Sequence, residues 1–374
     1  MAGIYIHIPF CKQACYYCDF HFSTSLKKKV ALVHALVKEL ELRKNEFSGI
    51  TVETIYLGGG TPSLLTKEEL EEIFQVIYSN YKISETAEIT LEANPDDLSY
   101  EKIKELDQGP VNRLSIGIQS FFEEHLKAMN RAHNAKEAQA CLELATHYFD
   151  NITIDLIYGI PDMTEEQWRE NLDIAFGFGI PHISSYALTV ESKTALETFI
   201  EKGTYPPLSE ELASKHFVIL MEETAKKGME HYEISNFGKP NYFSKHNTSY
   251  WKGKPYIGIG PSAHSFNGKV RSWNVANNTK YIQALEEGKL PSEYEELSLA
   301  DRFNEYIMTG LRTVWGVSLD FVRNEFGEPV LSQLLSQSQK HIDNATVIVE
   351  KGYLKTTAKG KFLCDGIASD LFMI

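Results

Sequence analysis

The sequence predicts an α/β protein in which parallel strands alternate with helices, followed by a smaller unit of helices and short strands. Two observations support this class. Apolar β-rich runs alternate with amphipathic stretches over roughly the first 190 residues, which is the pattern of βαβ units. Beyond Ser298 the spacing becomes helical and then ends in two strand-like runs. About six strand–helix units fit into the first part, fewer than a closed eight-unit barrel needs, so an open partial barrel and an open doubly wound sheet both remain.

Six apolar runs are the expected strands of the sheet. Each run is short and ends where glycine, proline or polar residues begin. The runs occupy residues 3–8, 51–57, 88–92, 113–118, 151–157 and 183–188. Because ligands bind at the carboxyl ends of the strands in both kinds of open sheet, the polar residues that follow these runs are the candidates for a site.

The helices are predicted from apolar spacing and from capping signals. Leucines four positions apart share one helical face of residues 27–43. Thr66 and Thr164 are each followed three positions later by Glu or Gln, the capping box that begins a helix. In the C-terminal unit we predict helices over residues 299–315 and 319–326 and strands over residues 349–355 and 357–364.

The composition excludes several classes of protein. With 374 residues and 43% hydrophobic content, the chain is long enough for a large core and two or three domains. Its formal net charge of -14 disfavours non-specific nucleic-acid binding, because an acidic surface repels phosphate. No apolar run approaches the ~18 residues that a membrane span requires. We therefore expect a soluble cytoplasmic protein without nucleic acid as a partner, in a compartment where thiols stay reduced.

Three cysteines near the start of the chain carry the strongest chemical signal. Cys11, Cys15 and Cys18 form C-x-x-x-C-x-x-C, and three thiolates can hold three corners of a [4Fe–4S] cluster, leaving one iron open to another ligand. Structural thiols, part of a disulfide framework, or a zinc site with His21 as fourth ligand are the alternatives. Five cysteines in all are too few for a disulfide scaffold.

Polar and glycine residues follow the predicted strands. Singly, each is more often structural, and a glycine run alone is weak evidence of a ligand site. Together they supply two carboxylates, an amide, a guanidinium and a glycine run at one edge of the sheet, which can hold a ribose by its hydroxyls and an amino acid by its amine and carboxylate. The residues are Gly58–Gly60, Thr61, Glu92, Gln119, Arg131 and Asp155. S-adenosylmethionine joins a ribose to an amino acid and can cap an open iron.

At this point the sequence resembles the radical SAM superfamily. The cysteine triplet, Tyr17 before the last cysteine, and Gly58 to Thr61 match its cluster and amine-binding motifs. The segments YIHIPFC, GGGTPSLL, LEANP, RLSIGIQSF, DLIYGIP and SYALT look like the oxygen-independent coproporphyrinogen oxidase group, nearly end to end.

The resemblance implies a radical SAM partial (β/α)6 barrel with a small C-terminal winged-helix-like α+β domain. It implies a radical SAM core over residues 1–235, an extension over 236–295 and the C-terminal domain over 296–374. It also implies that Arg131 suits the methionine carboxylate. The implied contacts with S-adenosylmethionine are Tyr5, Phe20, Gly60, Thr61, Glu92, Gln119, Arg131, Asp155 and Ala187.

Three features are similar to the HemW-like haem chaperones rather than to the decarboxylating oxidases. Phe20 stands where those oxidases carry a fourth cysteine, and the first strand begins too early for their long N-terminal extension. The segment from His246 to Trp251 matches the H-N-x-x-Y-W motif of the chaperone branch, which is linked to haem. His246 could supply an axial nitrogen, and Tyr250 and Trp251 flat apolar faces for a porphyrin. Other histidines that could contact the iron are His264, His7 and His21.

From this resemblance we expect a chaperone that binds haem and delivers it to client haemoproteins such as respiratory enzymes, with a [4Fe–4S] cluster and S-adenosylmethionine as cofactors. The alternative is oxygen-independent coproporphyrinogen III oxidase, so whether the chain is an enzyme stays open. A zinc-only structural protein is a third and more distant reading. A homodimer is compatible with the sequence.

Overall fold

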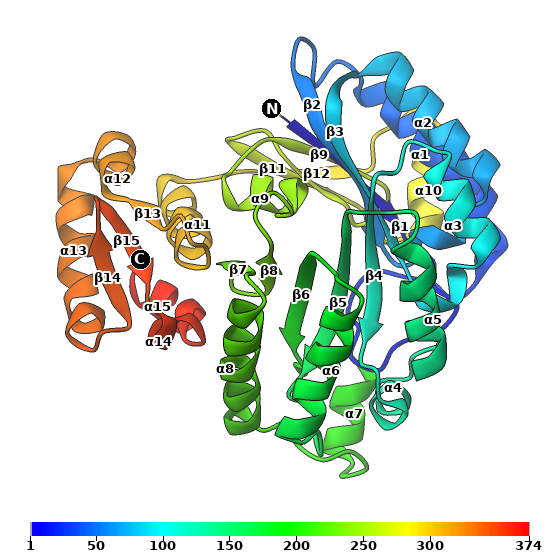
Figure 1. The fold of residues 1–374 in the computed structure, drawn as a ribbon. Coiled ribbons are helices and arrows are strands. Elements are labelled where there is room, and N and C mark those ends of the chain that lie inside the picture. The colour runs from blue at the N-terminus through cyan, green and yellow to red at the C-terminus, as the bar shows by residue number, and fades with distance from the viewer. Residues whose placement is uncertain (1, 374) are drawn as a thin grey trace.

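A twelve-stranded sheet dominates the structure, a computed structural model that describes residues 2–373 (Figure 1). Its neighbours follow the order β12-β11-β10-β9-β1-β2-β3-β4-β5-β6-β8-β7, and β1 to β6 are parallel. These six strands are β1 (Ala2–Ile8), β2 (Thr51–Gly59), β3 (Lys82–Ala93), β4 (Arg113–Gln119), β5 (Ile152–Tyr158) and β6 (His182–Ala187). All six predicted strands are confirmed, although β3 begins at Lys82 rather than at residue 88.

Helices connect consecutive strands and lie on the outer side of the curved sheet (Figure 1). They are α1 (Lys29–Arg43), α2 (Lys67–Asn80), α3 (Tyr100–Asp107), α4 (Glu123–Ala128), α5 (Ala135–Ala145) and α6 (Glu165–Gly177). Both predicted capping boxes are confirmed, at the starts of α2 and α6.

The order of the strands decides between the two sheet types left open by the sequence. A doubly wound sheet reverses its strand order at a switch point, whereas β1 to β6 here run in chain order without a reversal. The sheet also stays open, because β1 pairs with β9 and β6 pairs with β8 instead of with each other. The predicted partial (β/α)6 barrel is therefore confirmed, and the doubly wound alternative is wrong.

Later segments extend both edges of this sheet. Their strands are β7 (Glu230–Glu233), β8 (Asn236–Gly238), β9 (Tyr256–Ile259), β10 (His264–Phe266), β11 (Val270–Asn274) and β12 (Ser292–Glu296). Their helices are α7 (Ala195–Glu201), α8 (Glu210–Lys226), α9 (Lys245–Trp251) and α10 (Asn278–Glu286). The segment over residues 236–295 thus joins the sheet at both ends, and the division of the chain at residues 235 and 295 stays a prediction.

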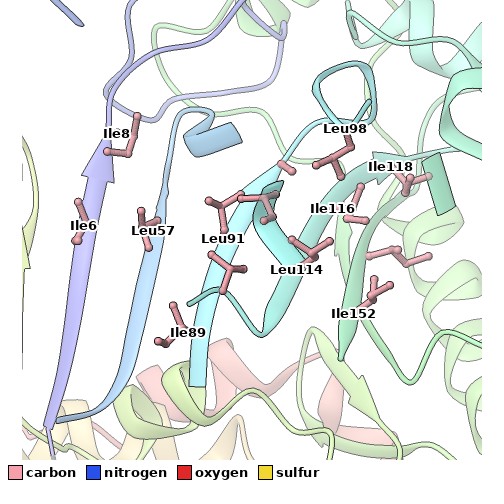
Figure 2. Packing of buried hydrophobic residues seen from close by; sticks show 14 of the residues in the cluster. Ile6, Ile8, Leu57, Ile89, Leu91, Leu98, Leu114, Ile116, Ile118 and Ile152 are labelled. Atoms are coloured by element: carbon pink, nitrogen blue, oxygen red, sulfur yellow. The ribbon is translucent and has the colours of Figure 1, made fainter. Parts of the chain in front are cut away.

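The two faces of the barrel sheet differ sharply in polarity. Register pairs Ile6, Leu57, Leu91, Leu114 and Ile152 in one row across the strands (Figure 2), and these side chains share one buried core with residues of α1, α2 and α3. Each of these side chains is at most 1% exposed, and burying one contributes about 1.5–3 kcal/mol. The intervening residues face the concave side and are mostly polar. The strict alternation therefore builds a hydrophobic outer layer and leaves a polar interior.

A second hydrophobic core lies in the C-terminal part, drawn from residues between Phe303 and Leu371. Its elements are α11 (Leu299–Leu311), β13 (Val317–Ser318), α12 (Leu319–Phe326), α13 (Glu328–Asp343), β14 (Val347–Glu350), β15 (Tyr353–Thr356), α14 (Ala358–Lys361) and α15 (Cys364–Asp370). The succession α11–β13–α12–α13–β14–β15, with the sheet order β13-β15-β14, is that of a winged helix. The predicted winged-helix-like α+β domain is confirmed.

Two predicted strands in this domain were wrong. The run at residues 349–355 contains the turn of a hairpin, because Lys351 and Gly352 have φ angles of 50° and 81°, as a two-residue hairpin turn requires. The run at residues 357–364 is not a strand, since Thr357 caps α14 by accepting the Gly360 N–H. The helix predicted to reach residue 315 ends at Leu311.

Candidate functional site

The cysteine triplet lies on the loop that leaves β1, at the carboxyl ends of the barrel strands. Cys11, Cys15 and Cys18 are half-buried with free thiols. The Cys11 N–H donates to Ser23 O at 3.1 Å, and the Tyr16 N–H donates to Met129 O at 3.1 Å, which ties the loop to itself and to the α4 region. The three thiols are therefore presented from an anchored segment.

Two of the three thiols, those of Cys11 and Cys18, must lose their protons before they can bind a metal. Burial raises the pKa of Cys11 and raises that of Cys18 to about 11, although a hydrogen bond from the Phe20 N–H lowers the latter in part. Both thiols are protonated at neutral pH until a metal displaces the protons.

Among residues 2–373 no group of three or more His, Cys, Asp or Glu side chains is placed to hold a metal ion. His21, the fourth ligand that a zinc site would need, shares a hydrogen bond with Asn278 Oδ1 at 2.7 Å. Three thiolates at this spacing can hold three irons of a [4Fe–4S] cluster.

Arg131 lies beside this loop with its guanidinium buried. Its Nη1 donates to the Cys15 sulfur at 3.3 Å, and its Nη2 donates to Asn94 Oδ1 at 2.6 Å and to Gly117 O at 2.8 Å. Its Nε is buried without a partner among the described residues. A buried donor left in this way fits an acceptor such as a carboxylate.

The glycine run at the end of β2 packs against the end of β1. Gly59 has a φ of +105°, and a Cβ built there would lie 2.3 Å from His7 Nδ1. A Cβ on Gly60 would lie 2.7 Å from the carbonyl oxygens of Ile8 and Phe10. No side chain fits at either position, so the backbone itself lines the site. Thr61, the next residue, is buried and accepts a hydrogen bond from Asn94 Nδ2 at 3.1 Å.

Two carboxylates face the concave side of the sheet. Glu92 accepts from the Tyr56 hydroxyl at 2.7 Å and from the Gly59 N–H at 3.1 Å. Burial raises the pKa of Glu92, and burial together with the charge of Glu92 raises the pKa of Asp155 to about 7. Near neutral pH Asp155 can therefore either donate or accept a hydrogen bond, as binding a ribose hydroxyl requires.

Most of the remaining predicted contacts lie at the same edge. Gln119 ends β4 with a φ of 65° where the pairing with β5 shifts register, and a Cβ on Gly117 would lie 3.0 Å from its amide nitrogen. The Tyr5 hydroxyl shares a hydrogen bond with His7 Nδ1 at 3.0 Å. Ala187 ends β6 and lines a groove of about 1020 Å³ that is bounded by the C-terminal domain. Phe20 differs from these, because its side chain is 66% exposed.

His246 lies apart from the cysteine loop, on α9 near the amino ends of β1 and β2. Its Nδ1 is 2.8 Å from Thr54 Oγ1, its Nε2 is 2.7 Å from the Tyr250 hydroxyl, and its backbone N–H donates to Glu88 at 3.1 Å. The ring is 1% exposed, and burial lowers its pKa to about 3. Both ring nitrogens are thus engaged, and the axial ligation of haem iron by His246 stays a prediction.

Tyr250 and Trp251 border a second groove, of about 1080 Å³, between α9 with the neighbouring strands and the C-terminal domain. Aromatic side chains line much of it, including Tyr256, Tyr306 and Trp315. Lys252 lies 4.2 Å from the Trp315 ring centre, and Arg312 lies 5.6 Å from that of Trp251.

The other candidate histidines make structural contacts. His7 Nε2 contacts His21 O at 2.8 Å. His264 is exposed and lies near Trp273, with ring centres 6.0 Å apart. The glycine-rich segment before His264 is held by Glu39, which accepts the Gly260 N–H at 2.8 Å.

Sequence reasoning missed two members of the site. Tyr56 holds Glu92, and Asn94 joins Thr61 to Arg131. The signal for Asn94 was its position directly after a strand. Tyr56 precedes Gly58 by two residues and so shares its face, which the strand period would have indicated.

Comparisons with known proteins agree with this architecture. Residues 5–175 match the radical SAM superfamily, and residues 297–363 match the HemN C-terminal domain. In the solved structure of coproporphyrinogen III oxidase (HemN) from Escherichia coli, described as a radical SAM enzyme, the fold superposes with a TM-score of 0.86. That match is 22% identical and covers 100% of this chain and 90% of the other. At this identity it shows only that the fold is shared.

Curated relatives are similar over nearly the whole length. The heme chaperone HemW of Lactococcus lactis is 34% identical over 375 residues, covering 97% of both chains. That of Bacillus subtilis is 33% identical over 367 residues, again covering 97% of both. HemW of Escherichia coli is 31% identical over 356 residues, covering 90% of this chain and 92% of the relative.

Proposed function

The chain belongs to the HemW haem chaperones, within the radical SAM superfamily, and from this membership we propose that it binds haem and passes it to client haemoproteins. The observation that carries the proposal is the aromatic groove beside α9, because the motif residues Tyr250 and Trp251 form part of its wall. We call it the haem groove from here on.

The chemistry of the haem groove suits a porphyrin. Its volume of about 1080 Å³ is at the upper end of ordinary ligand pockets, as a large flat ligand requires. Aromatic walls offer stacking surfaces. Lys252 and Arg271 supply positive charge for propionates, although Arg271 is paired with Glu305 at 2.7 Å.

We assign the loop site to a [4Fe–4S] cluster and S-adenosylmethionine. Cys11, Cys15 and Cys18 would hold the cluster, and Arg131 would bind the methionine carboxylate through its Nε, which has no partner among residues 2–373. Glu92 and Asp155 would bind the amine and the ribose hydroxyls. A bound and reduced cluster would be able to supply an electron to the sulfonium of S-adenosylmethionine; the protein's part is to bind, to orient and to exclude water.

The assignment of haem to this groove can be tested by a haem titration. Trp251→Ala should weaken haem binding at least about five-fold, because it removes a large flat face from the wall. Trp273→Ala is the matched control, since Trp273 lies outside the haem groove, and it should leave the Soret titration unchanged. An equal effect of both variants, or of neither, would place haem elsewhere.

The oxidase alternative is tested by turnover. The polar interior with Glu92 and Asp155 is compatible with a substrate, but Phe20 stands where the oxidases carry their fourth cysteine. Reconstituted protein incubated with coproporphyrinogen III, S-adenosylmethionine and a reductant should yield no protoporphyrinogen. Detection of that product by chromatography would move the assignment to the oxidase.

The clients, the oligomeric state and the compartment belong to the same proposal. We expect respiratory haemoproteins as clients and the cytoplasm as the compartment, and a homodimer is compatible with the chain. Within residues 2–373, none of the helices combines the length and apolar character needed to span a membrane.

A further inference from the structure

We propose that binding of S-adenosylmethionine at the loop site weakens haem binding in the haem groove, and that Tyr56 and His246 are the positioning residues that connect the two sites. The inference rests on the proposed function, because it takes both ligand sites from it. In this proposal His246 connects Tyr56 with Tyr250 and does not bind the haem iron.

The connection is a continuous series of direct contacts. Glu92, at the loop site, accepts the Tyr56 hydroxyl at 2.7 Å. The Tyr56 ring stacks on His246 with centres 5.0 Å apart and planes 25° from parallel. His246 Nε2 lies 2.7 Å from the Tyr250 hydroxyl, and Tyr250 forms part of the wall of the haem groove.

The cysteine loop reaches the same pair of rings by a second route. The His21 carbonyl lies 2.8 Å from His7 Nε2, and His7 Nδ1 shares a hydrogen bond with the Tyr5 hydroxyl. The Tyr5 ring in turn stacks on Tyr56 with centres 6.2 Å apart. A displacement at the loop site is therefore passed to Tyr56 by two routes, through Glu92 and through Tyr5.

The rings have little room to absorb a displacement. His246 is fixed by Thr54 on one ring nitrogen and by Glu88 on its backbone. A Cβ on Gly3 would lie 3.3 Å from the His246 ring, so the strand beneath it is already in close contact. Closely packed groups transmit a shift instead of dissipating it.

Glu92 is the group through which a bound ligand would act on Tyr56. Its Oε1 is engaged by Tyr56, so an amine or hydroxyl of a ligand that takes this oxygen must displace the Tyr56 hydroxyl or share it. Release of the Tyr56 hydroxyl loosens the stacking of its ring on His246. The hydrogen bond between His246 and Tyr250 is weakened as a result. By linkage, haem then lowers the affinity for S-adenosylmethionine by the same factor.

The test is a haem titration of anaerobically reconstituted protein with and without saturating S-adenosylmethionine. In the wild type the haem Kd should rise at least about five-fold, the lower end of ordinary coupling. In Tyr56→Phe, which keeps the ring and removes the hydrogen bond to Glu92, the ratio should fall below about two-fold.

Tyr81→Phe is the matched control. It also removes one buried hydrogen bond, from the Tyr81 hydroxyl to Leu40 O, but lies away from both sites. This variant should keep the wild-type ratio, and its thermal midpoint monitors the cost of the lost bond. Should Tyr56→Phe fail to fold, Tyr250→Phe cuts the same path at the His246 hydrogen bond.

The outcomes separate the inference from the proposed function. Saturable haem binding with an unchanged or lowered Kd on adding S-adenosylmethionine overturns the inference and leaves the chaperone intact. A full ratio retained in Tyr56→Phe overturns the path. Absence of saturable haem binding in the wild type instead sinks the proposed function.

Discussion

At the scale of single residues, the site is defined by polar groups whose partners are incomplete or whose charge is suppressed. Arg131 donates to Asn94 Oδ1, Gly117 O, the Tyr17 hydroxyl and the Cys15 sulfur, yet its Nε has no partner among the described residues. Glu92 and Asp155 share the concave face, where burial raises the pKa of both carboxyls and the charge of Glu92 raises that of Asp155 further. Buried polar groups with missing partners or shifted pKa values are typical of binding sites, because the ligand supplies the missing interactions.

The raised pKa of Asp155 should be measurable as a pH dependence of the protein's stability. Its folded pKa of about 7 lies above the usual value near 3.9, so the folded state binds the proton more tightly. Stability in the ligand-free protein should therefore fall as pH rises from about 4 to about 7.

Asp155→Asn removes that titration. Its melting temperature should exceed that of the wild type at pH 8 and approach it at pH 5, as measured by calorimetry without cofactors. Exposed Asp150→Asn serves as the control and should not change the pH profile. A variant less stable than the wild type at pH 8 would contradict the raised pKa.

At the scale of elements, local chemistry decided what could be predicted. The six strands and both capping boxes followed from short-range patterns and were confirmed. The C-terminal hairpin was misplaced, because the Lys351–Gly352 turn has only one glycine to signal it and an apolar run continues on both sides. The position of α9 could not be predicted either, since Thr54 and Glu88, which hold it, lie more than 150 residues earlier in the chain.

At the scale of the whole molecule, the C-terminal domain is fastened to the barrel at the edge of the sheet. Arg312 pairs with Glu233 at 3.3 Å and with Asp365 at 2.6 Å. The Val314 N–H donates to Tyr232 O at 2.9 Å, and Lys361 Nζ donates to His231 O at 3.2 Å. Arg312 also lies 5.6 Å from the centre of the Trp251 ring, so this attachment contacts the wall of the haem groove.

Arg312→Ala should loosen the domain. It removes the ion-pair partner of Glu233, which is 1% exposed, although Ser235 and Asn236 still donate to that carboxylate. With Arg312 itself partly exposed, we expect a loss of about 1–3 kcal/mol in the free energy of unfolding and weaker haem binding.

Calorimetry and haem titration measure both effects of Arg312→Ala. Arg323→Ala is the matched control, because Arg323 pairs with Asp320 and Glu328 on the exposed surface of the same domain. It should change stability by no more than about 0.5 kcal/mol. Equal losses in the two variants would show that Arg312 does not fasten the domain.

The sequence by itself determined the strand–helix alternation, the residues at the strand ends and the cysteine spacing, because each depends on neighbours a few positions away. Only the tertiary structure decided that the open sheet is a partial barrel and not doubly wound, that both ring nitrogens of His246 are bonded, and that Tyr56 joins Glu92 to that ring. These features depend on contacts between residues far apart in the chain, and no local pattern encodes the partner of a buried polar group.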